Sequence, residues 1–194
     1  MSVPVDDMAL RVQETTLVER ARHGDRDAFG QLVQRYAGDA IRLASFITGS
    51  GVDAEDVTQE AFIKAFRGLN RFRDDRALRP WLLRIVANEA KNNLRAAGRR
   101  ARRERLAGWD RSLMAPVVGS GPDPLVAGVD SPALLDALAS LGDRDRQVIA
   151  YRYFAGLGEA EMAVALGCAP GTVKSRLARA LGRLRAELER VTNG

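Results

Sequence analysis

The sequence contains very few of the residues from which metal and thiol sites are built. Among its 194 residues there is one cysteine, Cys168, and one histidine, His23. A single cysteine excludes an internal disulfide, and the two residues together are too few for the usual zinc sites. We therefore expect no metal and no cofactor. His23 lies in segment 22–25, which is typical of a helix end followed by a turn, so we interpret it as a solvated helix-terminal residue.

Long apolar runs and nucleotide-binding motifs are also absent. No apolar stretch approaches the roughly 20 residues that a helix needs to cross a bilayer, and the charged segment 1–25 has no secretory core. We expect a cytoplasmic protein without direct membrane insertion. The glycine patterns of phosphate-binding loops, dinucleotide folds and nucleophile elbows do not occur. These absences argue against an enzyme and against a small-molecule substrate.

The net charge is only +5, yet the basic residues are unevenly distributed. Segment 84–105 has eight basic and two acidic residues, and segment 170–185 has five basic and no acidic residues. The rest of the chain is consequently acidic overall. Two basic tracts on an acidic body indicate two contacts with polyanions, although a solvated arginine-rich helix face would explain either tract alone.

Apolar residues recur at intervals of three and four along most of the chain, and strand-like alternation is absent, so we predict an all-α protein. The predicted helices cover approximately residues 12–23, 27–48, 54–69, 80–98, a segment from 132, 145–153, 159–166 and 172–191. Segment 107–130 is rich in glycine and proline and has little periodicity, which indicates a linker. We predict two small helical domains, residues 1–104 and 131–194, joined by a flexible linker over 105–130.

Residues 159–173 have the pattern of a helix-turn-helix. Ala163 is small where two helices would cross closely, Gly167 occupies a turn that favours positive φ, and Val173 is apolar on the inward side of the second helix. We interpret Cys168, in the turn, as a small semi-buried residue rather than a redox sensor. The motif alone does not distinguish a repressor from other DNA-binding proteins.

The last predicted helix separates into two faces. Its inward face carries Val173, Leu177, Ala180, Leu184 and Leu188. Its outward face carries Thr172, Ser175, Arg176, Arg179 and Arg183. Arginine can form two hydrogen bonds with guanine or phosphate, and a helix N-terminus favours phosphate. We therefore favour DNA contact over a merely solvated face.

The helix that Pro80 is predicted to open is also two-faced. Trp81, Leu82, Ile85 and Leu94 supply its packing side. Its polar stripe consists of Arg84, Asn88, Lys91, Asn92 and Arg95. Asparagine side chains can read base edges, while arginine and lysine can hold phosphates. Just upstream, segment 70–79 could receive an unstacked base beside Phe72.

Three strings resemble signatures of the extracytoplasmic-function (ECF) RNA polymerase sigma factors of the sigma-70 superfamily. Residues 53–66 (DAEDVTQEAFIKAF) resemble the polymerase-binding signature of that family. Residues 80–92 (PWLLRIVANEAKN) resemble its promoter-melting helix, and residues 171–180 (GTVKSRLARA) its upstream-element recognition helix. The strings occur in the family's order, and the resemblance covers nearly the whole chain outside the linker.

The resemblance implies roles for three sets of residues. Docking on the coiled coil of the largest polymerase subunit falls to Asp53, Glu55, Asp56, Gln59 and Glu60. Capture of a flipped base of the minus-ten element falls to Asn88 and Asn92 with the loop 72–79. Together with the basic stripe described above, the minus-ten set is Phe72, Arg76, Arg84, Asn88, Lys91, Asn92 and Arg95. The minus-thirty-five set is Thr172, Lys174, Ser175, Arg176, Arg179 and Arg183. By position alone, the acidic cluster could equally be a first helical turn favoured by the helix dipole. The sequence departs from the family at Ala169, where a serine is more usual, and this weakens hydrogen bonding in the turn.

The resemblance implies a sigma factor, with domains corresponding to sigma regions 2 and 4. Such a factor binds core RNA polymerase and directs promoter-specific initiation, here for a stress or envelope-signal regulon under an anti-sigma factor. We expect its two arginine-bearing surfaces to lie far apart in the fold, on one promoter. The alternatives are a stand-alone DNA-binding regulator and a helical scaffold with solubilising basic tracts. The regulator leaves segments 53–66 and 81–92 unexplained and lacks a receiver-like α/β pattern.

Overall fold

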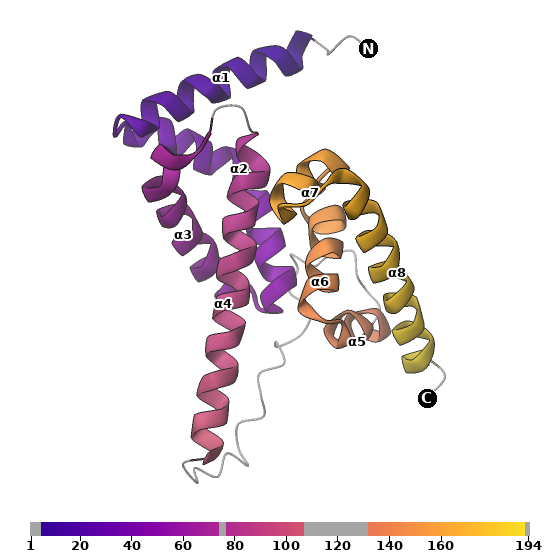
Figure 1. Cartoon of the computed structure of the whole chain (residues 1–194). Coiled ribbons are helices and arrows are strands. Elements are labelled where there is room, and N and C mark those ends of the chain that lie inside the picture. The colour runs from indigo at the N-terminus through magenta and orange to yellow at the C-terminus, as the bar shows by residue number, and fades with distance from the viewer. Residues whose placement is uncertain (1–4, 74–76, 107–131, 193–194) are drawn as a thin grey trace.

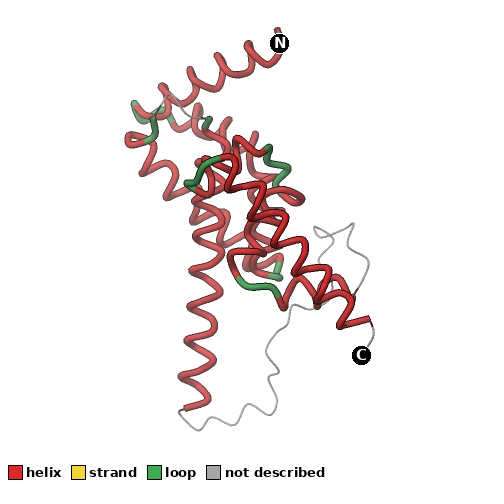
Figure 2. The backbone as a smooth tube through the Cα atoms, turned by 45° about the vertical axis from the view of Figure 1, so that its right-hand side comes forward, coloured by secondary structure: helices red, strands yellow, loops and turns green. Residues whose placement is uncertain are grey.

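The computed structural model describes residues 5–73, 77–106 and 132–192, and all regular structure in these ranges is helical (Figure 2). The N-terminal domain consists of α1 (Val5–Arg22), α2 (Arg26–Thr48), α3 (Gly51–Gly68), the 3-10 turn η1 (Leu69–Arg71) and α4 (Leu78–Leu106). The C-terminal domain consists of α5 (Pro132–Ser140), α6 (Asp143–Ile149), the π-helical turn η3 (Ala150–Phe154), α7 (Glu159–Leu166) and α8 (Pro170–Thr192). The predicted all-α class with two helical domains is confirmed. Most of the predicted linker lies outside the described residues.

The long helix α4 differs from its predicted bounds at both ends. It begins at Leu78 rather than Pro80, and it continues to Leu106 rather than ending near Gly98. Pro80 is therefore the third residue of the helix, where the backbone N–H would have no intrahelical acceptor in any case. Residues 99–106 are arginine, alanine, glutamate and leucine, which favour helix strongly enough to carry it past one glycine.

Two glycines with positive φ end helices at the expected places. Gly49 has φ +71° and closes α2, and its N–H donates to the carbonyl of Ser45 at 2.8 Å. Gly167 has φ +63° and closes α7, as the helix-turn-helix pattern predicts. The backbone N–H groups of Thr172 and Val173 then donate to the carbonyl of Ala169, which starts α8. The turn between α7 and α8 is thus fixed by backbone hydrogen bonds.

Helices α2, α3 and α4 pack side by side, and α1 crosses one end of this group (Figure 1). Leu43 of α2 and Leu83 of α4 are fully buried between them, as is Ala61 of α3. In the C-terminal domain, Met162 and Val173 are fully buried where α7 meets α8. The small side chain of Ala163 is 8% exposed, which agrees with its predicted place at a helix crossing.

The two domains are not separate bodies in this structure. Helix α4 packs against α7, and α2 packs against η3. Tyr151, Leu157 and Met162 of the C-terminal domain belong to the same apolar cluster as Leu43 and Leu83 of the N-terminal domain. One hydrophobic core therefore runs through both domains.

The buried hydroxyl of Tyr151 makes stability depend on pH in alkali. Burial raises the pKa of Tyr151 to about 12, although the Gln147 amide, which donates to its oxygen, and the charge of Arg84 oppose the rise. In an unfolded chain a tyrosine titrates near 10. Because the unfolded chain releases this proton first, the folded state loses up to about 2–3 kcal/mol as pH rises from 10 to 12.

We expect Tyr151→Phe to flatten this loss, measured as urea-unfolding free energy at pH 9 to 11.5. Tyr153→Phe is the matched control, because Tyr153 lies in the same turn but is 60% exposed. Equal alkaline slopes in the wild type and Tyr151→Phe would contradict this account.

Candidate functional site

A groove of about 780 Å³ runs between α2 and α3. Its apolar floor is formed by Phe29, Val33, Ala37 and Ile41 from α2 and by Phe62, Ile63 and Phe66 from α3. The ring of Phe29 lies 4.9 Å from that of Phe66 and 6.5 Å from that of Phe62, centroid to centroid. An open groove with a broad apolar floor is typical of a surface that receives another protein's helices.

The five residues predicted to bind polymerase are all exposed on α3. Glu55, Asp56 and Gln59 line the groove on the α3 side, and Arg26 and Arg67 line it as well, so charges of both signs border its apolar floor. Asp53 and Glu60 are not among the groove residues. The backbone N–H of Asp53 donates to the hydroxyl of Ser50, which caps the helix, and Glu60 pairs with Lys64 at 3.5 Å.

The apolar floor of this groove was not predicted as a functional surface. Its signal is present in the sequence, because Phe29, Val33, Ala37 and Ile41 recur at intervals of four along α2. Leu32 and Tyr36, on the adjoining face, are buried in the core. A helix with two neighbouring apolar stripes has more apolar surface than one core contact covers.

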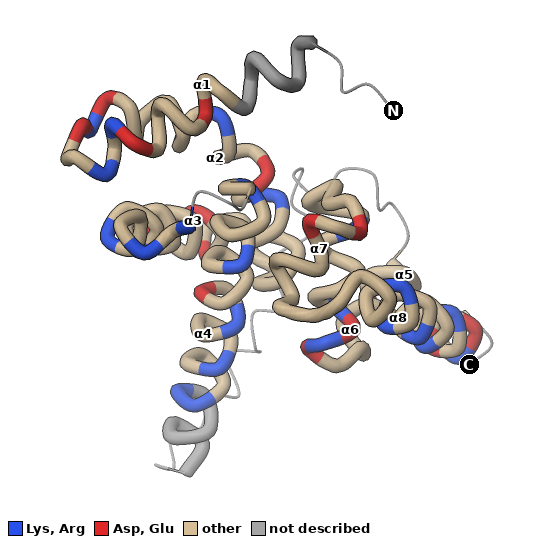
Figure 3. The backbone as a smooth tube through the Cα atoms, turned by 45° about the horizontal axis from the view of Figure 1, so that its top comes forward, with Lys and Arg blue, Asp and Glu red and all other residues tan. Residues whose placement is uncertain are grey.

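A second cavity of about 1010 Å³ lies between the two domains. Helix α4 contributes Arg84, Asn88, Lys91 and Arg95, and α8 contributes Arg176, Arg179 and Arg183. Asp143, Arg144 and Asp145, at the start of α6, also line it. We call this cavity the interdomain cleft. Basic residues follow both α4 and α8 (Figure 3).

The interdomain cleft corrects one expectation. The two arginine-bearing surfaces were expected to lie far apart in the fold, and instead they line the same cleft. The physical reason is the shared apolar core, which brings α7 and η3 against α4 and α2. Periodicity within each helix could not reveal a contact between the domains.

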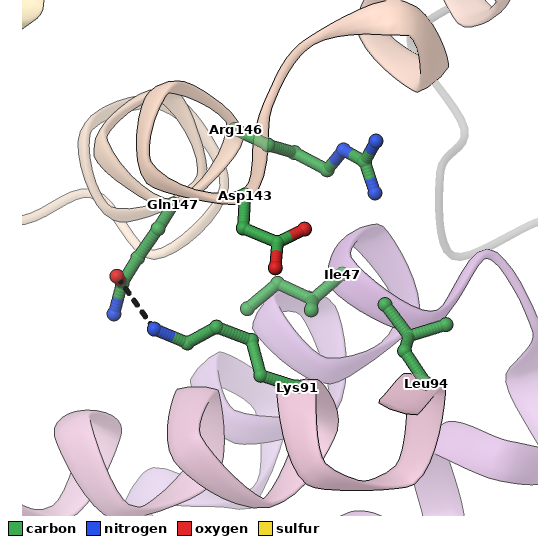
Figure 4. A pocket seen from close by; sticks show the side chains of 6 residues that line it. All are labelled: Ile47, Lys91, Leu94, Asp143, Arg146 and Gln147. Carbon is green, nitrogen blue, oxygen red and sulfur yellow. Dashed lines mark hydrogen bonds between the residues drawn. The ribbon is translucent and has the colours of Figure 1, made fainter. Parts of the chain in front are cut away.

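Half-burial of Lys91 in the interdomain cleft changes its electrostatics. Its Nζ donates to Oε1 of Gln147 at 2.8 Å (Figure 4). Burial lowers the pKa of Lys91, and the neighbouring charge of Arg95 lowers it further, while Asp143 opposes both. On the other side of the cleft, Arg183 pairs with Asp145.

Other predicted DNA-binding residues lie outside the interdomain cleft. Asn92 is exposed on α4, and Lys174 pairs with Glu159 at 3.5 Å. At the start of α8 the Ser175 hydroxyl donates to the carbonyl of Thr172 at 3.1 Å. The carbonyl of Ser175 accepts from Nε of Arg179, which does line the cleft, also at 3.1 Å. Arg76 lies outside the described residues.

Phe72, predicted to lie beside an unstacked base, is 7% exposed. The ring centroid of Phe72 lies 5.0 Å from that of Trp81. The guanidinium carbon of Arg22 lies 5.9 Å from the centroid of the Phe72 ring. Nε of Arg22 also donates to the carbonyl of Leu69 at 3.1 Å. A base could stack on Phe72 only after this packing has opened.

The described part of the chain contains no cluster of three or more histidine, cysteine, aspartate or glutamate residues that could hold a metal ion. Within the same residues, no helix combines the length and the apolar character needed to cross a membrane. The two predicted turn residues have the expected exposure. Cys168 is half-buried, and His23 is exposed, with Nδ1 2.8 Å from the carbonyl of Glu19.

Comparison with known proteins identifies similar sequences over both domains. Residues 32–100 match the family described as Sigma-70 region 2, and residues 131–184 match Sigma-70, region 4. The RNA polymerase sigma-H factor of Pseudomonas aeruginosa is 35% identical over 184 residues, covering 89% of this chain and 92% of that protein. The ECF RNA polymerase sigma-E factor of Escherichia coli is 38% identical over 178 residues, covering 89% and 93%.

Two solved structures resemble the whole fold. CnrH in complex with the cytosolic domain of CnrY has a TM-score of 0.65 at 29% identity, and the match covers 91% of this chain and 97% of that one. The sigma factor RpoE of Bartonella quintana, in complex with the anti-sigma factor NepR, has a TM-score of 0.61 at 26% identity. That match covers 83% of this chain and 96% of RpoE.

Proposed function

Because this chain belongs to the extracytoplasmic-function group of the sigma-70 family, whose members direct RNA polymerase to promoters, we propose a role for each of its surfaces. The α2–α3 groove docks on core polymerase, α4 engages the minus-ten element, and α8 reads the minus-thirty-five element. The observation that carries this assignment is that residues from three separate strings gather on an exposed groove and a basic cleft. The family consists of initiation factors that are not enzymes, and we propose that this chain catalyses no reaction itself.

The groove suits docking on a polymerase coiled coil for two reasons. Its floor offers apolar area whose burial drives association. Glu55 and Asp56 offer negative charge to basic side chains of the partner, and Arg26 and Arg67 offer positive charge to acidic ones. Gln59 adds a neutral hydrogen-bonding group beside them. Asp53 and Glu60, which the family resemblance includes, do not line the groove. Their contribution to polymerase binding is the negative electrostatic potential that they add around it.

The helix α4 suits opened promoter DNA. Asn88 carries an amide that can bond base edges, and it lies between the cations Arg84, Lys91 and Arg95, which can bond phosphates. Asn92 extends the same role beyond the cleft. The burial of Phe72 means that capture of a base beside it, with Arg76 contributing, accompanies a rearrangement of the segment before α4.

The helix α8 suits duplex DNA. Arg176 and Arg179 are exposed near its N-terminus, where recognition helices contact base edges. Thr172, Lys174 and Ser175 supply contacts that set the position on the phosphate backbone, and Arg183 extends the contact along the helix. The assigned domains are residues 1–104 for polymerase and minus-ten binding, and residues 131–194 for the minus-thirty-five element, with 105–130 as linker.

An anti-sigma factor is the proposed regulator. CnrH and RpoE, which resemble this chain at TM-scores above 0.6, were solved in complexes with CnrY and with the anti-sigma factor NepR. We propose that a comparable protein restrains this chain until a stress or envelope signal arrives, and that the chain works in the cytoplasm beside RNA polymerase. A pull-down of the full chain that recovers polymerase subunits alone would count against such a regulator.

Transcription from a promoter library tests the main assignment. We expect core polymerase plus this chain to produce transcripts with defined start sites, and core polymerase alone to produce none. A stand-alone regulator would bind DNA without polymerase and yield no defined starts, and a scaffold would do neither. Mapping the starts would also reveal the two promoter elements.

A further inference from the structure

The last residue of α1, Arg22, is held in place by the corner of the chain that follows it. Gly24 has φ +90°, and its N–H donates to the carbonyl of Ala21 at 3.0 Å, so the chain turns sharply after the helix. Asp25 then caps α2 by accepting from two N–H groups of its first turn. Val18, one turn before Arg22, is 3% exposed in the shared apolar core. Arg22 therefore extends from a rigid support.

From this support the guanidinium of Arg22 reaches the turn η1. Its Nε donates to the carbonyl of Leu69 at 3.1 Å, and its Nη2 donates to the carbonyl of Phe72. The N–H of Phe72 donates to the same Leu69 carbonyl at 3.0 Å. One side chain thus binds the backbone at the first residue of η1 and at the residue after it. Hydrogen bonds from a charged donor are about twice as strong as neutral ones, so Arg22 holds this backbone more firmly than the turn's own bond does.

The same guanidinium contacts an aromatic pair at the start of α4. Its carbon lies 5.9 Å from the ring centroid of Phe72, a cation–π contact. The Phe72 ring in turn lies 5.0 Å from that of Trp81, with the ring planes 50° apart. We call Phe72 and Trp81 the aromatic platform. Trp81 precedes Asn88 by seven residues, so the two lie on the same side of α4, two turns apart. The platform is therefore in line with the amide proposed to read the minus-ten element.

Base capture on this platform depends on how well its backbone is held. Stacking of one unpaired base on an aromatic side chain contributes about 1–3 kcal/mol. Because Phe72 is 7% exposed, its ring must rotate away from the present packing to receive a base. Rotation of the side chain leaves the bonds from Arg22 to the two carbonyls intact. If the backbone had to be ordered at the same time, the cost would offset much of the stacking free energy.

Helix α1 has no other part in the surfaces assigned above. Among the residues that the structure describes, none from α1 lines the α2–α3 groove or the interdomain cleft. Arg22 also precedes residues 32–100, which match Sigma-70 region 2. The contacts of α1 are with η1 and with α2, where Nη2 of Arg35 donates to Gln13 at 3.2 Å. The contact with η1 is thus the route by which α1 can influence DNA binding.

From these contacts we propose that Arg22 is a positioning residue for capture of the minus-ten base. It fixes the backbone of η1, so that Phe72 meets the base in one defined orientation. The proposal rests on the minus-ten role assigned to Phe72 and α4 above. A fixed platform discriminates between bases because it cannot shift to accommodate a wrong one. Arg22 therefore contributes to the choice of base as well as to the affinity for single-stranded DNA.

The anchoring is tested first without DNA or polymerase. Arg22→Ala removes both carbonyl bonds and the contact with the Phe72 ring. We expect the backbone N–H of Phe72 in the full chain to exchange with solvent about ten- to a hundredfold faster in this variant, because loss of charged hydrogen bonds favours local opening of η1. Amide hydrogen exchange followed by NMR measures the rate.

Base choice is then measured with the holoenzyme. Single-stranded oligonucleotides carry the mapped minus-ten element or one of its single-base variants, and fluorescence anisotropy gives each affinity. We expect Arg22→Ala to weaken binding of the cognate strand by about five- to tenfold and binding of strands with a wrong captured base by less than twofold. Affinity for the duplex minus-thirty-five element should stay unchanged, because α8 is not affected.

Arg20→Ala is the matched control for charge and position. Arg20 lies two residues earlier on α1, and its partner is Asp25 at 2.7 Å instead of η1. This variant loses the same positive charge, and it should keep both the slow exchange of the Phe72 N–H and the base preference. Arg22→Lys keeps the charge but not the planar fork that spans two carbonyls, so it should restore part of the lost preference.

Three results would overturn the proposal. Exchange of the Phe72 N–H at the wild-type rate in Arg22→Ala would remove the anchoring. Equal weakening of cognate and non-cognate strands would reduce Arg22 to a general attraction for DNA, and so would equal losses in Arg20→Ala and Arg22→Ala. A wild-type holoenzyme that prefers no base at any position of the element would instead contradict the proposed function, and the exchange measurement would be unaffected by that failure.

Discussion

Replacement of Asp56 by arginine is expected to weaken binding of core RNA polymerase by about a hundredfold, or about 2.7 kcal/mol. Asp56 is exposed at the border of the apolar groove, where a bound helix would exclude water from around its carboxylate. A positive charge there would oppose a basic partner at close range, and such juxtaposition costs several kcal/mol. Fluorescence anisotropy of the labelled chain titrated with core polymerase measures the affinity.

Two further charge-reversal variants test whether this effect is specific to the groove. Glu60→Arg, on the same helix but outside the groove lining, should weaken binding by less than tenfold. Asp136→Arg on α5 changes the net charge equally at an exposed position of the other domain and should have no measurable effect. Unchanged polymerase recruitment by Asp56→Arg combined with Glu60→Arg would refute the docking surface.

Truncation of Arg176 to alanine is expected to reduce affinity for the minus-thirty-five element by about 5- to 150-fold, the range for loss of one two-bond contact with a base. Arg176 is exposed in the second turn of α8, on the side that lines the interdomain cleft. The loss should fall on the cognate sequence more than on random duplex, because base contacts carry specificity and phosphate contacts do not. Competition binding of the holoenzyme with cognate and random duplexes measures both.

Arg185→Ala supplies the control on the same helix. Arg185 is 83% exposed, pairs with Glu189 at 3.2 Å and does not line the cleft, so its removal should leave cognate binding within twofold of wild type. Equal losses from Arg176→Ala and Arg185→Ala would indicate nonspecific electrostatic attraction instead of a reading contact. The slope of log affinity against log salt should change by about one unit if Arg176 contacts a phosphate rather than a base.

Local patterns in the sequence were sufficient to predict much of the fold. The positive φ of Gly167, the start of α5 at Pro132 and the inward face of α8 around Val173 and Ala180 all follow from spacing and backbone chemistry. The predicted ends of α4 were less accurate, because Pro80 and Gly98 were given more weight than the helix-forming residues around them.

The relation between the domains could not be predicted in the same way. Nη1 of Arg79 donates to Oε1 of Glu161 at 3.2 Å across the two domains, yet the two residues are 82 positions apart and neither belongs to a pattern that points to the other. The apolar floor of the groove had a periodic signal in α2, but its function depends on the neighbouring stripe of α3, which lies beside it only in the folded chain. Contacts between distant segments are set by packing and not by local propensity.

The π-helical turn η3 has a consequence for how sequence changes in this region would be tolerated. The backbone N–H of Ala155 bonds the carbonyl of Ala150, a span of five residues in place of four. This wider turn lets Tyr151 point into the core while Phe154 reaches Phe46 in the other domain. Deletion of a single residue here would restore an ordinary helix but rotate the following side chains by about 100°. A chain without the extra residue would therefore need a different partner for Phe46.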